Sequence, residues 1–370
     1  MTDQSDSISR VLNGRTWEDF CDRLKAAGQI ILRPETPATE LDRAEGWRYL
    51  TRLLRVGLEM MLESSDPDFP SFYMASHPTA KIGADNPDNT YLNATITGDR
   101  EYRMFGSRGT VPYLSFGSKA NRYAIDGTMA STGELESHAL KCAPDGSFEV
   151  IASAKPQSGN WLPLAPDSSM ILVRQTFLDR SREKPASVGI ERIGGPLRPS
   201  PLSAERLERG LAAAAAFVHG TARTFADWTQ MFRGKPNTLE TLDQSLFCKA
   251  GGDPRIFYLH GYWAFAKDEA LVIDTPVPEC EIWNIQVDNY WMESLDYRHL
   301  PITVNKHTAR YNPDGSVTFV LAAEDRGVGN YLCTGGHETG TLLLRWTGAK
   351  THPVPKCRVV KLAEIGAQSR

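Results

Sequence analysis

Two neighbouring loops in the last quarter of the chain carry side chains that can transfer protons. The first loop holds Glu324, Asp325 and Arg326, and the second holds His337 and Glu338. Histidine titrates near neutral pH, and an adjacent carboxylate can fix its tautomer and raise its basicity. We therefore predict that Asp325 orients His337 as a general acid and base. The alternative is a solvated surface loop with incidental ion pairs, because structural networks assemble the same groups.

Tyr297 and Arg298 are the predicted partners of this pair in catalysis. A phenol or a guanidinium can stabilise the negative charge that develops on a carbonyl oxygen. The four residues together suit an enzyme that needs no organic cofactor and acts on an apolar or aromatic small molecule with a carbonyl or hydroxyl group. Lyase, dehydratase, isomerase and hydrolase chemistry all fit this set.

The two loops belong to a segment that the chain contains twice. Residues 144–162 read PDGSFEVIASAKPQSGNWL, and residues 313–332 read PDGSVTFVLAAEDRGVGNYL. The likeness continues into ILVRQT and LLLRWT, which aligns Arg174 with Arg345. A turn, a strand, a Gly-Asn pair and an Arg-containing strand rarely recur at near-constant spacing by chance, so we infer an internal duplication.

Residues common to both copies are predicted to serve the fold. The Asp-Gly pairs at 145–146 and 314–315 suit tight turns with positive φ, and the Gly-Asn pairs suit a sharp turn in which Asn adopts a left-handed conformation. We expect Arg174 and Arg345 each to pair with a carboxylate or with backbone carbonyls. The acidic and imidazole groups of 324–338 have no counterpart in the first copy, which is why the chemistry is placed there.

Aromatic residues concentrate in the second copy, with nine between positions 257 and 297. Neighbouring side chains of a strand point to opposite faces, so these residues cannot all fill one sandwich core. We predict that some line a small-molecule pocket, together with interspersed polar groups such as His260. An aromatic-rich protein interface is the alternative. The predicted substrate-binding residues are Tyr262, Trp263, Trp283, Asn289, Trp291 and Asn330.

Short runs of β-branched and aromatic residues, separated by Gly, Pro, Asp and Asn turns, predict a mainly β protein with helical additions, of the α+β class. Two tandem jelly-roll or β-sandwich-like units are expected. Apolar residues at helical spacing predict helices at 16–27, at 40–62 and from Ser203 to Gly234. Ser203 is a predicted N-cap, and Thr16 with Asp19 a predicted capping box.

The predicted organisation has four parts. They are an N-terminal helical segment at 1–65, a first β unit at 66–180, a linker with a long helix at 181–240, and a second β unit at 241–370.

The composition argues against several partners. The 370 residues carry a formal net charge of −4 with no basic stripe, so we expect no nucleic acid partner. The first residues lack the apolar core of a signal peptide, and no apolar run could span a bilayer, so we expect a cytoplasmic protein with no membrane partner. Six scattered cysteines without a CxxC pair suit reduced thiols. No metal or cofactor motif is present, and we expect neither.

The segment from 269 to 348 resembles a known bacterial family. Its residues EALVID, EIWNIQVDNYWMESLDYR and VNKHTARYNPDGSVTFVLAAEDRGVGNYLCTGGHETGTLLLRWTG are similar to domain of unknown function 1214, whose members often carry it after the related domain 1254. The family pattern Asn-Trp-Leu-Asp-Thr is Asn-Tyr-Leu-Cys-Thr at 330–334, and the Gly-His pair recurs at 336–337. The resemblance implies jelly-roll-like β domains and a homo-oligomer, but no particular reaction.

A non-catalytic protein is the alternative to an enzyme. In that case the β domains would use the aromatic belt to bind a ligand, a protein partner or a carbohydrate. Replacement of His337 by Ala distinguishes the two, because an enzyme would lose turnover and keep ligand affinity, whereas a binding protein would lose affinity or show no change.

Overall fold

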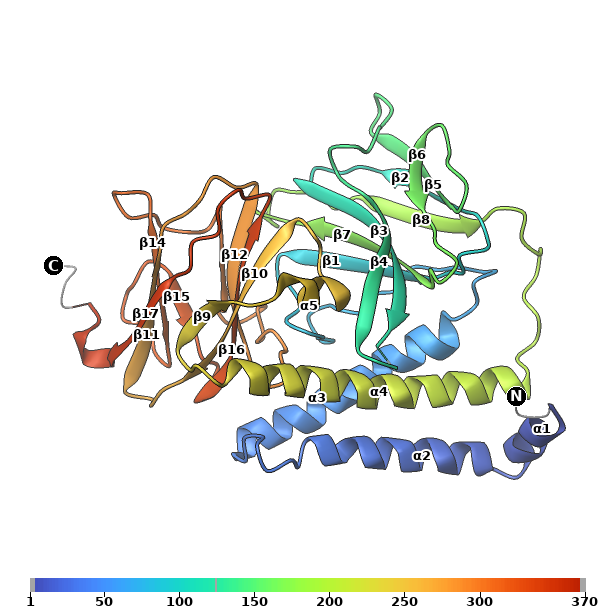
Figure 1. The fold of residues 1–370 in the computed structure, drawn as a ribbon, viewed down its shortest axis with the longest axis horizontal. Coiled ribbons are helices and arrows are strands. Elements are labelled where there is room, and N and C mark those ends of the chain that lie inside the picture. Colours follow the sequence, from blue (N-terminus) through green and yellow to red (C-terminus); the bar gives the residue numbers. More distant parts are fainter. Residues whose placement is uncertain (1–3, 124, 367–370) are drawn as a thin grey trace.

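The computed structural model describes residues 4–123 and 125–366, and Figure 1 shows two β-rich halves side by side above a layer of helices. Strands predominate, which confirms a mainly β protein with helical additions. Each half contains two four-stranded sheets. Of the helices in the described ranges, none is both long enough and apolar enough to cross a membrane.

The first half packs one sheet against another, with a core that includes Phe116, Val150 and Val173. One sheet has the strand order β1-β7-β3-β4, from Asn89–Thr95, Met170–Thr176, Tyr113–Arg122 and Thr128–Leu135. The other has the order β6-β5-β2-β8, from Asn160–Pro163, Ser147–Ser153, Tyr102–Ser107 and Ser187–Arg192. Since β8 pairs with β2, this half extends beyond residue 180.

The second half is built in the same way around a core that includes Trp263, Trp283 and Phe319. One sheet has the order β10-β16-β12-β13, from Ile256–Ala264, Thr339–Thr347, Ile282–Asp288 and Thr303–Asn305. The other has the order β15-β14-β11-β17, from Tyr331–Cys333, Val317–Ala322, Glu269–Thr275 and Lys356–Lys361. A short strand, β9 (Thr238–Thr241), precedes this half.

Both halves share one strand order. Each strand from β1 to β8 corresponds to the strand whose number is nine higher, so that β1 corresponds to β10 and β8 to β17. With this correspondence, the strand orders of both sheets are identical in the two halves. β6 runs parallel to β5, and β15 runs parallel to β14 in the same way. The Asp-Gly turns before β5 and β14 are also alike, because Gly146 and Gly315 have φ values of 82° and 83°. The predicted positive φ at these turns is confirmed.

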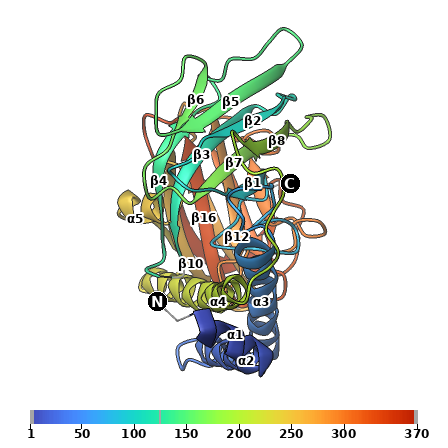
Figure 2. The same cartoon turned by 90° about the vertical axis from the view of Figure 1, so that its right-hand side faces the viewer.

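Helices cover one side of the sheets (Figure 2). They are α1 (Gln4–Leu12), α2 (Arg15–Ala27), α3 (Glu40–Leu58) with a π-helical turn (Glu59–Glu63), and α4 (Ala204–Phe232), with a 3-10 turn at Gly28–Ile30. Helix α5 (Gln244–Lys249) lies apart from this layer, beside β4 and β10, and a second 3-10 turn (Leu362–Glu364) follows β17. The predicted N-cap of α4 is confirmed, since the Ser203 side chain accepts a hydrogen bond from the Arg206 N–H. The predicted capping box of α2 is wrong, because its N-cap is Gly14 and no side chain caps it.

A third apolar core joins the halves to the helices. The alternation of side chains along β10 explains it: Leu259 and Trp263 point into the sandwich core, whereas Tyr258 and Tyr262 point out of it. The outward side chains meet Phe225 of α4 and other helical residues in one buried cluster. The site described below lies in this cluster.

Candidate functional site

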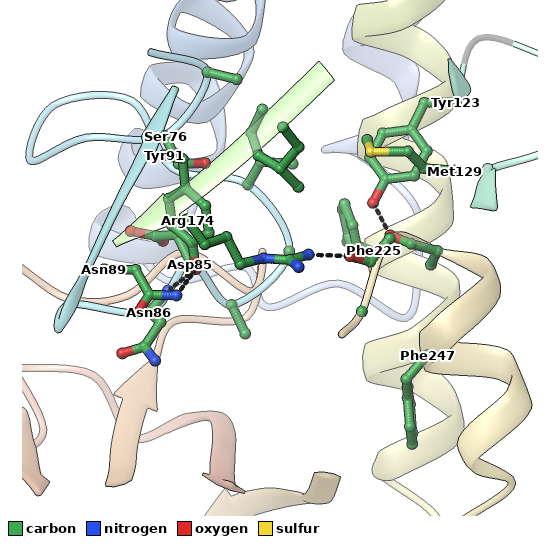
Figure 3. Close-up of a pocket in the computed structure, with 18 of the residues that line it drawn as sticks. Ser76, Asp85, Asn86, Asn89, Tyr91, Tyr123, Met129, Arg174, Phe225 and Phe247 are labelled. Atoms are coloured by element: carbon green, nitrogen blue, oxygen red, sulfur yellow. Dashed lines mark hydrogen bonds between the residues drawn. The ribbon is translucent and has the colours of Figure 1, made fainter. Parts of the chain in front are cut away.

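A cavity of about 170 Å³ lies where the two halves meet the helices. Its walls come from β1 and β7 of the first half, from β10 and β16 of the second, from α4, and from the loops at 75–89 and 250–252. Figure 3 shows Asp85, Asn86 and Tyr91 on one side, with Phe225 and Phe247 on the other. Most of the lining is apolar, with a few polar groups, which is the usual composition of a small-molecule site.

Equivalent arginines from the two halves line this one cavity. In the β1–β7 pair, Arg174 lies opposite Tyr91, and in the β10–β16 pair, Arg345 lies opposite Tyr258. The two arginines therefore occupy the same place in the shared strand order. Each points out of its own sandwich and toward the space between the halves.

Arg174 has an acidic partner. Its Nη1 atom lies 3.4 Å from Oδ2 of Asp253, and its Nη2 atom donates to the carbonyl oxygen of Gly251. The Tyr113 hydroxyl lies 3.2 Å from Oδ2 of Asp253 and 2.5 Å from Oε2 of Glu136, so the two carboxylates compete for its hydrogen. The expected pairing with a carboxylate or with backbone carbonyls is confirmed, and Arg174 has both kinds of partner.

Arg345 has uncharged partners. Its Nη2 atom donates to the carbonyl oxygen of Ala84 at 2.5 Å, and its Nη1 atom donates to Oε1 of Gln286 at 2.5 Å and to Oδ1 of Asn284 at 3.4 Å. Within the described ranges, no carboxylate oxygen lies within 4.0 Å of this guanidinium. Arg345 is 5% exposed, so its charge is buried.

His260 faces the same cavity from β10. Its ring stacks on Phe232, with centroids 4.7 Å apart, and packs at a tilt of 37° against Phe247, with centroids 4.4 Å apart. The Nδ1 atom is buried and has no hydrogen-bond partner among the described residues. Burial, and to a smaller extent the charge of Arg345, lowers the pKa of His260 well below its ordinary value, so the imidazole is neutral at pH 7.

The loop that closes one wall has a strained backbone. Gly83 and Ala84 have φ values of 60° and 56°, and a Cβ atom on Gly83 would lie 2.3 Å from the Phe225 ring. Asp85 follows, and its carboxylate accepts hydrogen bonds from the backbone N–H and the hydroxyl of Ser294. A non-glycine residue at positive φ is uncommon and concentrates at functional sites.

Buried carboxyl groups lie behind this wall. Burial raises the pKa of Asp288 to about 7, although Gln286 donates a hydrogen bond to it at 2.5 Å. Burial also raises the pKa of Asp88 to about 6, against the effect of a hydrogen bond from Asn305. Neither carboxyl group is among the residues that line the cavity.

The predicted His337–Asp325 pair is wrong. Nδ1 of His337 lies 2.7 Å from Oδ1 of Asp42, at the start of α3, and both residues are buried. Burial alone would raise the pKa of Asp42, but hydrogen bonds from His337 and Thr39 hold it below its ordinary value. Asp325 is exposed and accepts a hydrogen bond from the Gly327 N–H. The sequence could not reveal this because Asp42 belongs to a helix far away in the chain.

Tyr297 and Arg298 do not join His337. Arg298 is exposed and forms an ion pair with Asp296 at 2.7 Å. The ring of Tyr297 is half-buried beneath the Lys81 ammonium group, which lies 4.2 Å from its centroid. Neither residue is among those lining the cavity, so the predicted catalytic set is not assembled in this structure.

The predicted substrate-binding residues also serve the fold. Trp263 and Trp283 are fully buried in the second sandwich core, so they are not available to a ligand or a surface carbohydrate. Tyr262 and Trp291 pack in the core that joins the halves, and Asn289 donates to Glu293 at 3.0 Å. None of these five residues is among those that line the cavity.

Asn330 has a structural role that Asn160 repeats. The Asn330 amide exchanges hydrogen bonds with the backbone of Arg310 and donates to the Thr318 carbonyl. The Asn160 amide does the same with Lys141 and Glu149. Substrate binding by Asn330 is therefore contradicted. The expected left-handed conformation is wrong as well, because neither Asn has a positive φ.

The sequence predicts His260 as a polar group of a small-molecule pocket, and it does line the cavity, whereas it assigns the two lining arginines to the fold. Arg174 and Arg345 were interpreted as structural because they are common to both copies, and His260 was one polar residue among several. Successive side chains of a strand point to opposite faces, so the sequence of β10 predicts His260 on the same face as Tyr258 and on the other face from Leu259. No group of three or more His, Cys, Asp or Glu side chains within the described ranges is arranged to hold a metal ion.

Two solved structures are similar to this chain to very different degrees. The crystal structure of an uncharacterized protein from Burkholderia cenocepacia is 53% identical, covers 96% of this chain and 99% of its own, and superimposes with a TM-score of 0.95. The chain belongs to the family of this protein. The crystal structure of the VPA0106 protein from Vibrio parahaemolyticus is 12% identical, covers 86% of this chain and 98% of its own, and gives a TM-score of 0.49.

Residues 92–177 match the family model described as protein of unknown function (DUF1214), which confirms the resemblance. The matched residues lie in the first half, whereas the resemblance in the sequence is at 269–348, in the second half. None of the curated proteins compared with the chain is significantly similar to it.

Proposed function

We propose that this protein binds a small molecule in the cavity between its halves, and that the ligand has one aromatic ring and a short polar substituent. The observation that supports this most directly is His260. A buried polar atom without a partner costs about 1–3 kcal/mol, and a ligand hydroxyl or carbonyl would remove this cost when a turn of the imidazole ring brings Nδ1 to the cavity.

The size and composition of the cavity support a single-ring ligand. Its volume of about 170 Å³ is close to the roughly 150 Å³ of an engineered apolar cavity that binds benzene. Phe225, Phe247 and Trp228 line the space, and Trp228 meets each of the two phenylalanine rings edge to face. Such rings favour offset or edge-to-face contact with another aromatic ring.

Calorimetric titration with phenol and toluene tests this proposal. The two compounds have similar shapes, but only phenol can form a hydrogen bond with His260. Wild type should bind phenol about fivefold more tightly, which corresponds to about 1 kcal/mol for one hydrogen bond. The variant His260→Phe keeps a stacked ring and should bind both compounds equally.

A cavity-filling variant serves as the control. Leu343→Phe adds volume to the cavity wall and should weaken binding of phenol and toluene alike. The proposal is overturned if wild type binds neither compound, or if binding is unchanged in Leu343→Phe.

Acid–base catalysis in the same cavity is a second candidate function, and the neutral imidazole of His260 favours it. A cofactor-independent lyase, dehydratase, isomerase or hydrolase acting on a carbonyl or hydroxyl compound would use His260 as the base, with Arg345 stabilising the oxyanion. Wild type would then accelerate exchange of the α-protons of 1-phenylpropan-2-one into heavy water, followed by NMR. His260→Phe would abolish this acceleration, and a rate equal to buffer alone would exclude it.

We also propose that the two halves descend from one duplicated, jelly-roll-like unit. The common strand order, the matching Asp-Gly turns and the equivalent arginines support this origin. A reducing cytoplasm is the proposed compartment, because all six cysteines are free. The homo-oligomer stays a prediction, which light scattering of the purified protein tests.

A further inference from the structure

We infer that the ligand of this cavity is a carboxylate, held by Arg345. The inference rests on the proposed binding function and names the chemical class of the ligand. It depends on the difference between the two equivalent arginines and on the position of Arg345 relative to His260.

Arg345 brings a buried charge to the cavity without an acidic partner. Its three hydrogen-bond acceptors, Ala84, Asn284 and Gln286, are all neutral. Arginine remains protonated in proteins, and a buried charge costs several kcal/mol unless an opposite charge compensates it. Arg174 occupies the equivalent position and has Asp253 beside it. The second half therefore lacks the compensation that the first half supplies.

Asp288 and Asp88 interact electrostatically with Arg345, but neither forms an ion pair with its guanidinium among the described residues. Asp288 is separated from Arg345 by the neutral amide of Gln286, which bonds to both residues. Asp85 lines the cavity, but it is engaged by Ser294 and lies 3.8 Å from the Lys81 ammonium group. The positive charge of Arg345 is consequently the one that an incoming anion would meet.

The guanidinium also retains donors suited to a carboxylate. Nε and Nη2 form one edge of the group, and this edge pairs with carboxylates in a bidentate manner. Among the described residues, Nε–H has no acceptor, and the two N–H groups of Nη2 have one, the Ala84 carbonyl. A ligand carboxylate could therefore bind without displacing the contacts that hold the side chain.

Arg345 and His260 can engage one ligand at two points. His260 of β10 lies opposite Leu343 of β16. Arg345 is two residues after Leu343 in β16, so its side chain is on the same face of the sheet as Leu343 and His260. Such diagonal neighbours are about 7–8 Å apart. A short acid fits this spacing, with its carboxylate on Arg345, its ring against the aromatic wall and a hydroxyl or carbonyl near His260.

Phenylacetate and phenylacetamide are the probes for this inference, because they differ only in charge and hydrogen-bonding pattern at one end. Calorimetric titration of wild type should give at least about tenfold tighter binding of the acid, the lower end expected for hydrogen bonds to a charged group. Arg345→Gln should remove this preference, because it weakens binding of the acid much more than binding of the amide. Arg345→Lys should restore part of it. A surface control, Arg103→Gln, should behave as wild type.

A second variant keeps the test valid if Arg345→Gln does not fold. Asn284→Asp is isosteric and places a carboxylate next to the Arg345 guanidinium. It should weaken phenylacetate binding about tenfold and leave phenylacetamide unaffected. Equal affinity of wild type for acid and amide would overturn the inference while the binding function stands. Binding of neither phenylacetate, phenylacetamide, phenol nor toluene would overturn both.

Discussion

Nδ1 of His337 lies 2.7 Å from the carboxylate of Asp42, although 295 residues separate them in the chain. The contact joins the first turn of α3 to the loop before β16. His337, which the sequence predicts to be a catalytic acid and base, instead connects the N-terminal helices to the second half through this contact. Both partners are buried, so the pair is worth testing as a structural element.

Replacing His337 by Ala should destabilise the fold by about 2–4 kcal/mol, because Asp42 would remain buried without its partner. Asp42→Asn should be milder, since the amide oxygen can still accept the imidazole hydrogen. Chemical denaturation of both variants and of the double variant gives the coupling energy. Additive losses would show that the pair makes no contribution of its own.

The pH dependence of the same contact can be stated with its sign. The pKa of Asp42 is lower in the folded chain, so its contribution to stability is present above about pH 4 and is lost as the pH falls through the folded value. Wild type should therefore lose more stability than Asp42→Asn between pH 5 and pH 3. Parallel denaturation curves for the two proteins would contradict this.

Asp288 should show the opposite trend. Burial raises its pKa to about 7, so the folded chain holds this proton more strongly than the unfolded chain, and stability falls as the pH rises from about 4 to 7. The loss is roughly 4 kcal/mol at most. In Asp288→Asn a neutral amide replaces the protonated acid. The melting temperature of this variant, measured between pH 4 and pH 7, should therefore fall less with rising pH than that of the wild type. An unchanged profile would show that Asp288 titrates normally.

Gly83→Ala should be strongly destabilising, because it combines a positive φ with a Cβ atom 2.3 Å from the Phe225 ring. We expect a loss of about 2–4 kcal/mol, measured by urea unfolding. Gly146→Ala is the matched control, since Gly146 also has a positive φ but no atom within 4 Å of the added methyl group. It should cost about 1 kcal/mol. Equal losses would mean that contact with Phe225 is unimportant.

Asn330→Ala and Asn160→Ala compare the same contact in two environments. Both side chains bridge a loop and a strand through three hydrogen bonds, but Asn330 is buried and Asn160 is partly exposed. The loss should be about 2–3 kcal/mol at Asn330 and about half of that at Asn160, because water can replace the missing groups there. A larger loss at Asn160 would contradict this ranking.

Local patterns in the sequence predict the elements well. The helix stripe after Ser203 corresponds to α4, and the Asp-Gly turns lie where the repeat places them. The site was harder to predict, because it forms between elements far apart in the chain. Comparing the copies directed attention to residues that differ, such as Asp325, whereas the cavity is lined by residues that they share, Arg174 and Arg345. Shared residues can serve both fold and site when two like halves face each other.

The core that joins the halves to α3 and α4 has a consequence for cooperativity. Phe225 packs among residues of both halves, including Tyr123 from the first and Leu343 from the second. Neither half could be expressed alone without exposing this surface to water. Despite its two sandwiches, the molecule should unfold in a single transition.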